Sequence, residues 1–590
     1  MRPDVNFSEN GVWRPARRGR SALTVGVLGV ALLAMPGADA QAQTTGLPGV
    51  NAGSLQRQMD VGEPRVPQRR PAEAGAILLP GVTVDSVAAG VDDPGGPTLY
   101  LSGWKFTGNR LFDTAELRKV LSGVTGRQLS FSQIDRAARM IEAYYAENGY
   151  VARVTLPPQE VTGGVVLLDV QEGRYAGVAF EGTPPKRVKP EIIERIFDGN
   201  VVPGTALRPD RLDKPLLIAN GLYGIALSGA LAPGANPGET VLLLDGQDES
   251  PLATQLSFDN YGSRSIGEPR ASVQLGLYSP LRRGDLLLAR LTATEGSPDG
   301  MLRYSLPVGL RGAFVWADVG LMHYDVITSE LRALDPTGRS LTRSIGVSYP
   351  LLISRDRNVS LTFSYGRDDL ENEIRGDTVS HYHVSRAVLG LSGNAYDDFG
   401  GGGLTTFALS YSNGSASGTD IAGGFDDDFD IWRLSLARQQ NLPGRFDLLA
   451  QLSAQKGPRG LDSSEEFFLG GPYGVRAYPI GEGDGPSGAI VNLELQYELT
   501  ENWSVAGFYD HGWIADRTVS GEPSDYQLKG LGARLSWQHP TGWAADLTLA
   551  RRLGDNPNAI DDPTGSSLDG RDQDGSLRKF RAWFELRKTF

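Results

Sequence analysis

The chain ends with the sequence FRAWFELRKTF, residues 580–590, and this stretch decides the fold. If it is extended, one of its faces carries Phe580, Ala582, Phe584, Leu586 and Phe590. The opposite face carries Arg581, Glu585, Arg587 and Thr589, with Trp583 among them. A period of two that separates apolar from charged side chains is typical of a β-strand with water on one side and an apolar medium on the other.

The same alternation recurs upstream, and a helical period is absent from residues 254–590. Residues 491–499 alternate strictly between apolar and polar, and residues 271–277 and 407–411 follow the same pattern. With about 20 residues for each strand and its loop, this region holds roughly 16 strands. A soluble sandwich would place the apolar faces against a second sheet, whereas a membrane barrel would place them against lipid.

Three features favour the membrane barrel. The chain begins with a signal sequence, it ends in an aromatic residue as bacterial outer-membrane barrels usually do, and its predicted loops vary widely in length. We expect Asn413–Asp430 and Asp555–Ser576, both rich in Asp and Gly, to be long outer loops. The prediction is an all-β transmembrane β-barrel of about 16 antiparallel strands over residues 251–590.

Residues 1–40 have the three parts of a secretory signal peptide. Five arginines precede residue 21, an apolar run extends from Ser21 to Met35, and Ala38-Asp39-Ala40 fits the pattern of a cleavage site. A membrane anchor is the alternative, but it would need about 20 apolar residues. Residues 41–97, rich in Pro, Gly, Ala and Gln, are predicted to be a linker that contains one short helix.

Composition narrows the functional classes. The chain has no cysteine, which excludes disulfide scaffolds, zinc ribbons, thiol catalysis and iron–sulfur clusters. Lys and Arg number 57 and Asp and Glu number 70, and this net charge of −13 argues against binding to nucleic acid. A signal peptide, no cysteine and abundant glycine indicate a protein of the bacterial envelope.

Between the linker and the barrel, one β-α-α-β-β unit is predicted to occur twice, at residues 98–174 and 175–250. In the first unit, Asp113 with Glu116 fits the capping box that starts a helix. In the second, prolines stand at the first positions of both predicted helices. Two unrelated α+β modules are the alternative, but the shared order and length favour a tandem repeat.

Three patterns that could bind a cofactor or metal lack the context that such sites need. Residues 483–488 fit G-x-G-x-x-G but lie in a predicted barrel loop rather than between a strand and a helix. His381 and His383 share a strand face, but the chain has no H-E-x-x-H. The acidic runs at residues 426–428 and 569–575 are typical of solvated loops. We therefore predict no catalytic residues, no cofactor and no metal site.

The most specific motif is GGPYGVRAY, residues 470–478, which is followed by Phe508-Tyr509-Asp510-His511-Gly512. In a narrow lumen, an arginine and a carboxylate can make a bidentate contact that holds a loop in place. The alternative is that both charges only line a wet pore.

Together these motifs resemble the two-partner secretion transporters, also called the TpsB family of hemolysin and hemagglutinin secretion-activation proteins. In that family two POTRA domains precede a barrel of about 16 strands, so the resemblance covers nearly the whole predicted mature chain. Residues 149–150, 156–159 and 172–173 look like the first POTRA domain, and residues 216–220, 224–225 and 233–234 look like the second. Asp259-Asn260-Tyr261-Gly262-Ser263, with Gly267 and Arg270, is similar to the start of the family's barrel.

The resemblance implies a contact between a loop and the barrel wall. The family's sixth outer loop folds back into the barrel, and its motif corresponds here to Gly474, Val475, Arg476, Ala477 and Tyr478. Its arginine is expected to pair with the aspartate of a wall motif, which corresponds here to Phe508, Asp510 and Gly512. Ala477 stands where the family has glycine, and alanine would be strained if this position required a positive φ.

The resemblance also implies a function and a mechanism. The protein is expected to be an outer-membrane pore with periplasmic POTRA domains that exports a large β-helical exoprotein, of adhesin or cytolysin type, with an N-terminal secretion domain. We expect the client to add a strand to a POTRA sheet edge, at Val178 and Phe180 or at Gly224 and Ile225. In the family a helix near the mature N-terminus plugs the pore, and residues 54–59 lie where that helix should be.

Other partners and rival functions follow from the same architecture. Outer-membrane lipid and, during biogenesis, the barrel-assembly machinery are expected partners, and nucleic acid is not. The main alternative is an insertase that assembles other barrels, although insertases usually carry more POTRA units. A passive porin or receptor would lack these units, and a barrel enzyme would need an active site that the sequence does not assemble.

Overall fold

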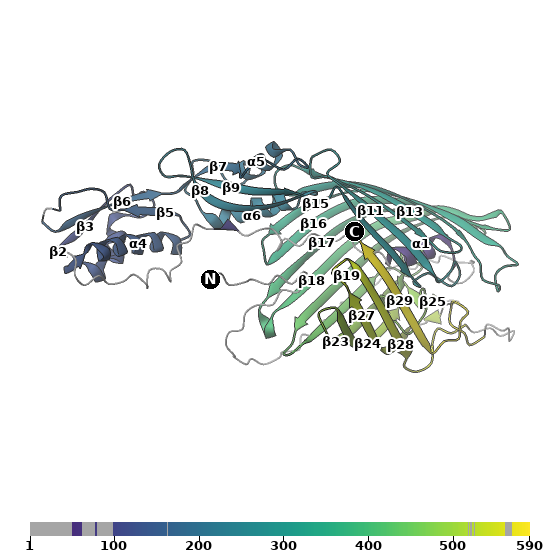
Figure 1. Ribbon diagram of the computed structural model, residues 1–590. Helices are drawn as coiled ribbons and strands as arrows, with labels where there is room; N and C mark the ends of the chain where they lie inside the picture. Colours follow the sequence, from purple (N-terminus) through teal and green to yellow (C-terminus); the bar gives the residue numbers. More distant parts are fainter. Residues whose placement is uncertain are drawn as a thin grey trace.

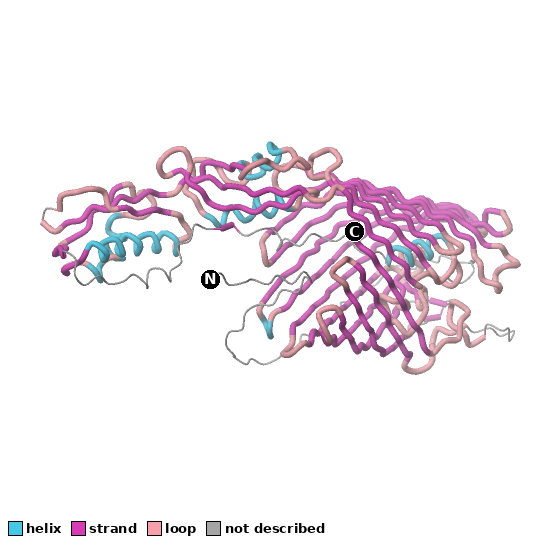
Figure 2. Tube along the Cα trace, in the orientation of Figure 1, coloured by secondary structure: helices cyan, strands magenta, loops and turns pink. Residues whose placement is uncertain are grey.

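The computed structural model describes residues 50–61, 77–78, 98–161, 163–516, 518–519, 522–523, 525–560 and 569–590. The predicted signal peptide and most of the predicted linker lie outside these residues. Figure 1 shows two small α+β units in a row beside a large barrel, and Figure 2 shows that the barrel wall consists of strands. No helix among the described residues is long and apolar enough to cross a bilayer.

The first α+β unit folds around two helices that begin with capping boxes. The Asp113 side chain accepts a hydrogen bond from the backbone N–H of Glu116, and the Ser130 side chain accepts one from Gln133. β3 pairs in parallel with β6, β5 pairs antiparallel with β6, and β2 pairs with β4. The elements are β2 (Thr98–Leu101), β3 (Gly103–Thr107), α3 (Thr114–Val120), a 3-10 turn (Ser122–Val124), β4 (Arg127–Ser130), α4 (Phe131–Glu147), β5 (Ala152–Thr155) and β6 (Val165–Glu172).

The second unit repeats this order. Its helices start with Pro190 and Pro209, where the missing N–H costs nothing because the first turn has no carbonyl partner for it. Phe197 and Leu216 from these helices and Tyr175 from the sheet are fully buried in one apolar core. The elements are β7 (Arg174–Phe180), α5 (Pro190–Asp198), α6 (Pro209–Asn220), β8 (Ile225–Pro233) and β9 (Glu239–Asp248).

A short strand from the linker joins the sheet of the second unit. β1 (Ile77–Leu78) pairs in parallel with β8, with Ile77 opposite Gly229 and Leu78 opposite Ala230. The sheet order is therefore β1-β8-β9-β7. The sequence did not indicate this strand, and it covers part of the β8 edge that the sequence suggested for client binding.

Sixteen further strands close into an antiparallel barrel, which confirms the predicted fold class. The strands are β10 (Leu252–Asp259), β11 (Arg270–Tyr278), β12 (Leu286–Ala293), β13 (Pro298–Val308), β14 (Ala313–Asp325), β15 (Pro336–Ile353), β16 (Arg357–Ile374), β17 (Asp377–Asp397), β18 (Gly403–Asp420), β19 (Gly423–Asn441), β20 (Phe446–Lys456), β23 (Ser487–Glu498), β24 (Trp503–Ala515), β27 (Tyr526–Gln538), β28 (Trp543–Arg552) and β29 (Phe580–Thr589). Large apolar side chains such as Leu291, Leu321 and Ile345 are more than 60% exposed, because they face outward from the wall. Alternating residues face the lumen, as a lipid-facing barrel requires.

One predicted loop is wrong. Residues Asn413–Asp430 form the ends of β18 and β19, which stay paired from Asn413 opposite Asp430 to Asp420 opposite Gly423. Asp, Ser and Gly suggested a loop, but a hairpin can carry polar residues on both faces where it extends beyond the lipid. In contrast, the described residues between β28 and β29 form no strand.

The second α+β unit is attached to the inner rim of the barrel by polar contacts. Ser279 Oγ donates to the Arg187 carbonyl (2.8 Å), the Lys189 N–H donates to the Arg282 carbonyl (3.1 Å), and Arg355 pairs with Asp213 (2.7 Å). These contacts place the unit against the turns that join β11 to β12 and β15 to β16.

Candidate functional site in the barrel lumen

The loop between β20 and β23, residues 457–486 and called L6 below, folds back as a double-stranded finger. Within it, β21 (Phe467–Phe468) pairs with β22 (Asp484–Gly485). The Gly470 N–H donates to the Glu482 carbonyl at 2.8 Å. At its tip, the Val475 N–H donates to the Leu469 carbonyl at 2.7 Å. A Cβ at Gly474 would lie 2.0 Å from the Leu469 carbonyl oxygen, so this turn requires glycine.

The tip of L6 is joined to the wall by Arg476 and Asp510. Arg476 donates from Nε to Asp510 Oδ2 (3.0 Å) and from Nη2 to Asp510 Oδ1 (2.8 Å), and its backbone N–H also reaches Oδ2 (3.0 Å). The Asp510 side chain is completely buried and that of Arg476 is 9% exposed. Such a bidentate, desolvated pair restricts the orientation of the loop as well as its distance from the wall.

Three further wall residues surround this contact. Arg476 Nη1 donates to Glu494 Oε2 (2.9 Å), and the other oxygen of Glu494 accepts from Arg534. The Arg476 guanidinium lies 3.4 Å from the centre of the Phe508 ring. Glu494 and Arg534 were not predicted from the sequence. Glu494 alternates with apolar residues in the strand at residues 491–499. Its position on the lumen side could therefore be predicted from the sequence, but its partner could not.

Asn492 and Trp583 hold the same tip through its backbone. Asn492 Nδ2 donates to the Gly474 carbonyl (2.9 Å) and to Asp510 Oδ1 (2.8 Å). Trp583 Nε1 donates to the Arg476 carbonyl (2.7 Å). Because Trp583 lies on β29, the L6 tip also contacts the last strand of the barrel.

The other motif residues pack the tip against wall glycines. Ala477 does not have a positive φ, so alanine is unstrained there. Its methyl group faces Gly530, where a Cβ would lie 2.8 Å away. Val475 faces Gly512 in the same way (3.0 Å), and Tyr478 is fully buried beneath the guanidinium of Arg552.

The base of L6 contacts the loop between β28 and β29. Glu482 is fully buried and accepts hydrogen bonds from Asn556 Nδ2 (2.7 Å) and the Gln573 N–H (2.9 Å). Burial raises the pKa of Glu482 to about 7. Both loops therefore depend on one carboxyl group that titrates close to neutrality.

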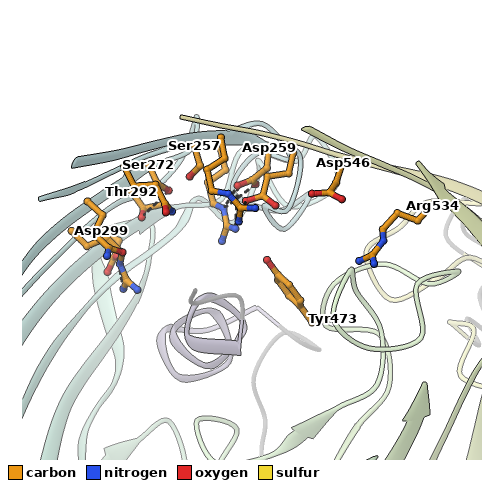
Figure 3. Close-up of a pocket in the computed structure, with 14 residues that line it drawn as sticks. Ser257, Asp259, Ser272, Thr292, Asp299, Tyr473, Arg534 and Asp546 are labelled. Atoms are coloured by element: carbon orange, nitrogen blue, oxygen red, sulfur yellow. Dashed lines mark hydrogen bonds and ion pairs between the residues drawn. The ribbon is translucent and has the colours of Figure 1, made fainter. Parts of the chain in front are cut away.

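The helix α1 (Ala52–Val61) also lies inside the barrel, where Figure 3 shows it beside the wall. It covers the predicted residues 54–59 and extends beyond them at both ends. Ala52 N–H donates to Asn372 Oδ1 of β16 (2.7 Å), and Ser463 Oγ of L6 donates to Asn51 Oδ1 (2.9 Å). Leu55 is 1% exposed and packs in an apolar cluster of the inner wall.

A polar cavity of about 330 Å³ remains beside Tyr473 of L6 and the inner wall, and its lining includes Asp259, Asp299 and Arg534 (Figure 3). Charged side chains of both signs line it, as expected for a wet lumen. Among the described residues, no group of three or more metal-ligating side chains lies close together.

The predicted client-binding residues lie at two different places in the second unit. Val178 and Phe180 are on β7, an outer strand of the sheet, and pack partly against its core. Ile225 is fully buried, and a Cβ at Gly224 would meet the Ser279 and Tyr278 side chains of the barrel. Of the two predicted positions, only Val178–Phe180 of β7 lies on a strand edge that has no partner strand among the described residues. Nearer the start of β7, Tyr175 exchanges backbone hydrogen bonds with Gly204 and Thr205.

Comparison with known proteins gives the family. The model of the haemolysin secretion/activation proteins ShlB/FhaC/HecB matches residues 238–536, and that of the ShlB-type POTRA domain matches residues 99–173. The chain belongs to this haemolysin secretion/activation family. The heme/hemopexin transporter protein HuxB of Haemophilus influenzae (strain 86-028NP) is 23% identical over 81% of this chain and 84% of its own length.

Solved structures agree on the fold. CdiB from Escherichia coli aligns with a TM-score of 0.61 at 20% identity, covering 91% of this chain and 98% of that chain. BamA from Haemophilus ducreyi lacking POTRA domains 1–3 aligns with a TM-score of 0.52 at 14% identity, covering 84% of this chain and all of that chain. Because the fold occurs in both, membership of the secretion/activation family decides the function. The protein is an outer-membrane transporter for a partner exoprotein, with its POTRA domains in the periplasm.

Proposed function

We propose that this transporter exports one large β-helical exoprotein, of adhesin or cytolysin type, whose N-terminal secretion domain binds a POTRA sheet edge. We also propose that transport involves no catalytic step. The proposed mechanism rests on two placements of the N-terminal segment. Its helix α1 lies in the barrel lumen, and its strand β1 pairs with the edge of β8. A relative described as a hemolysin transporter, ShlB of Serratia marcescens, is 28% identical over 36% of this chain, which supports a secreted protein as cargo.

In this mechanism the client strand competes with β1 for the edge of β8. Strand addition uses backbone hydrogen bonds, so an incoming strand can replace β1 without matching its sequence. β1 pairs through only two residues, Ile77 and Leu78, and is therefore easily displaced. Since residues 62–76 connect β1 to α1, displacement of β1 also removes one restraint on the helix in the lumen.

The overall function is tested by comparing the culture-supernatant and outer-membrane proteomes of cells with and without the protein. We expect one or two large proteins to disappear from the supernatant while other barrels are unchanged. A broad fall in outer-membrane barrels without a specific loss from the supernatant would instead identify an insertase.

The role of β1 is tested with Leu78→Pro and its matched control Leu78→Ala. Proline removes the backbone N–H and distorts the strand, whereas alanine keeps the backbone of the ladder intact. We expect the full-length Leu78→Pro protein to bind the client's N-terminal fragment several-fold more tightly than the Leu78→Ala protein does. Equal affinities of the two variants, measured by titration in detergent, would refute the competition.

A further inference from the structure

Two arginines lie directly opposite each other where β15 and β16 pair in the barrel wall. Arg343 of β15 is the ladder partner of Arg367 of β16. Like charges in directly opposite positions of a sheet repel each other, so this pairing by itself is unfavourable. The two side chains are 53% and 45% exposed, so both guanidinium groups are open to the surroundings of the barrel. The export mechanism described above gives this pair no role.

Both arginines face away from the lumen. On β16, the lumen side is marked by Asn372, which accepts a hydrogen bond from the backbone of α1. Because successive side chains of a strand point to opposite faces, Arg367 lies on the outer face of β16, together with the exposed Tyr365. On β15, Arg343 likewise shares the outer face with the exposed Ile345. The arginine pair therefore directly follows lipid-facing apolar residues on both strands.

The pair lies at the edge of the lipid-facing band that is further from the POTRA domains. The turn between β15 and β16 is next to the second α+β unit, because Arg355 of the turn pairs with Asp213 (Figure 1). Arg357 and Arg367 are ten residues apart on β16, which is about 26 Å along the barrel axis at ~3.4 Å per residue and a tilt of about 40°. The apolar band of a membrane barrel is about 25 Å tall. Arg367 therefore lies at the height of the headgroups of the outer leaflet.

The two arginines share one carboxylate, that of Asp369. Arg343 pairs with it through Nη2, and Arg367 Nε donates to Asp369 Oδ1 (3.3 Å). Arg339, further out on β15, has its own carboxylate partner in Glu371 (2.7 Å). A guanidinium has five N–H donors, and in the described part of the chain each arginine of the pair gives only one of them to Asp369. One positive charge and several donors thus remain for an anion.

The acidic residues further along the same rim do not cancel this charge. Asp428 and Asp430 of β19 are on the outer face, because Phe429 and Ile431, which alternate with them, are buried in the cluster on the lumen side. β19 is three strands from β16 in the barrel, or about 14 Å at ~4.8 Å per strand. This separation exceeds the Debye length of about 8 Å at physiological salt. Anionic headgroups are therefore attracted to β15 and β16 and repelled from β19.

We propose that Arg343 and Arg367 bind a phosphate group of a phosphorylated glycolipid in the outer leaflet. Arginine forks bind phosphate oxygens through charge-assisted hydrogen bonds, and a phosphate between the two guanidinium groups offsets their repulsion. The acyl chains of the same lipid then lie along the exposed side chains of Ile345, Phe363 and Tyr365. The ligand is a lipid rather than a dissolved anion, because the arginines and these apolar side chains form one continuous outer face.

The test is a titration of the purified full-length protein in detergent with diphosphoryl lipid A, an acylated glucosamine disaccharide with two phosphates. Native mass spectrometry measures the fraction of protein that carries the lipid. Arg343→Gln/Arg367→Gln should weaken binding at least tenfold, because charge-assisted hydrogen bonds to the phosphate are lost. The matched control is Arg357→Gln, the same change on the same face of β16 at the opposite edge of the lipid band, and it should bind as the unmodified protein does. Resistance of the barrel to SDS at room temperature verifies that each variant is folded.

Asp369→Asn distinguishes a ligand site from a set of ion pairs that only stabilises the wall. Without the carboxylate, the guanidinium groups of Arg343 and Arg367 are both free for the phosphate, so binding of diphosphoryl lipid A should become several-fold tighter. A purely structural role of these residues predicts no such gain. Unchanged or weaker binding by Asp369→Asn would contradict the proposal, as would equal affinities of Arg343→Gln/Arg367→Gln and the unmodified protein.

Two further ligands separate the phosphate from the acyl chains and the lipid from a dissolved anion. Lipid A from which both phosphates have been removed should bind weakly, and equally to the unmodified protein and to Arg343→Gln/Arg367→Gln. Inorganic phosphate at millimolar concentration should leave diphosphoryl lipid A bound. Equal binding of the two forms of lipid A to the unmodified protein would show that the acyl chains alone are recognised. Complete displacement by inorganic phosphate would show a plain anion site, and either result would overturn the proposal.

Discussion

L6 and α1 both lie inside the barrel, but different chemistry holds each of them there. The L6 tip is fixed by Arg476 between the buried carboxylates of Asp510 and Glu494. The first turn of α1 instead makes a neutral hydrogen bond to Asn372 and apolar contacts through Leu55. Separating a buried ion pair leaves uncompensated charge, at a cost of about 3–5 kcal/mol, whereas apolar contacts can be released and remade gradually. We therefore expect α1, rather than the L6 tip, to be the segment that leaves the lumen during transport.

The strongest way to break this comparison is to reverse a charge at the L6 tip. Arg476→Glu places three carboxylates together, and Asp510→Arg places two arginines together, so either change should unseat L6. We expect each variant to reduce export at least tenfold while the barrel still assembles. The reason is that breaking the buried Arg476–Asp510 pair costs about 3–5 kcal/mol. The measurement is the amount of client in the medium relative to the amount of transporter in the outer membrane.

The double variant Arg476→Glu/Asp510→Arg separates pairing from a mere requirement for each residue. Partial recovery of export would demonstrate direct coupling, although Glu494 then faces a glutamate and limits the recovery. Arg303→Glu is the matched control, since its pair with Asp318 on β13 and β14 lies away from L6 and is partly exposed. Normal export by both single variants would contradict the assigned role of the pair.

The next largest effect is expected on the α1 side of the comparison. Leu55→Asp would bury a carboxylate in an apolar cluster, so the helix should leave the lumen. Because burying a leucine is worth about 1.5–3 kcal/mol, the open population should rise roughly tenfold or more. The readout is the resting ion conductance of the purified protein in planar bilayers.

Leu55→Met, which conserves volume and polarity, is the control for this change and should keep the conductance of the unmodified protein. If Leu55→Asp conducts no more than Leu55→Met, the helix does not limit the pore, and the contrast between the two segments fails.

The sequence predicted most of this arrangement where the signal is local. Strand alternation over residues 491–499 and 580–590 indicated the barrel, whereas the contact of Arg476 with Asp510 was implied only by the resemblance of the two motifs to the transporter family. Contacts that depend on strand register could not be read in this way. Glu494 lies close to Arg476 because it pairs with Phe508 where β23 and β24 meet. The spacing of residues along the sequence does not determine which residues are opposite each other on two strands.

Two other features escaped prediction for different physical reasons. The β1 strand consists of two residues, too few for any period, and it exists only because β8 offers an edge. The stretch Asn413–Asp430 has a loop composition, yet it continues a ladder that backbone hydrogen bonds extend regardless of side-chain polarity. Composition is thus a weak guide where a strand leaves the lipid.

A smaller effect should sharpen the account of the L6 tip. Gly530→Ala would bring a methyl group to within 2.8 Å of the Ala477 methyl, so the tip must shift. We expect a several-fold loss of export, measured as above, because overpacking typically costs about 1–3 kcal/mol. Ala477→Gly alone should be close to neutral, and Ala477→Gly/Gly530→Ala should regain export. A double variant as poor as Gly530→Ala would mean that the two positions do not compensate for each other.

The smallest predicted effect concerns the base of L6 and is a dependence on pH. Burial holds the pKa of Glu482 at about 7, above its ordinary value near 4.5, so the folded protein retains a proton that the unfolded chain loses. Stability should therefore fall as pH rises from about 4.5 to 7 and then level off. Glu482→Gln cannot titrate, so its thermal midpoint should change less over this range, by a difference on the order of a few degrees. The exposed Glu501→Gln serves as the control and should follow the unmodified protein. Parallel pH profiles of Glu482→Gln and the unmodified protein would show that the base of L6 keeps its place whether or not Glu482 is protonated. The contact of Arg476 with the wall would then be the interaction that holds L6 in the lumen.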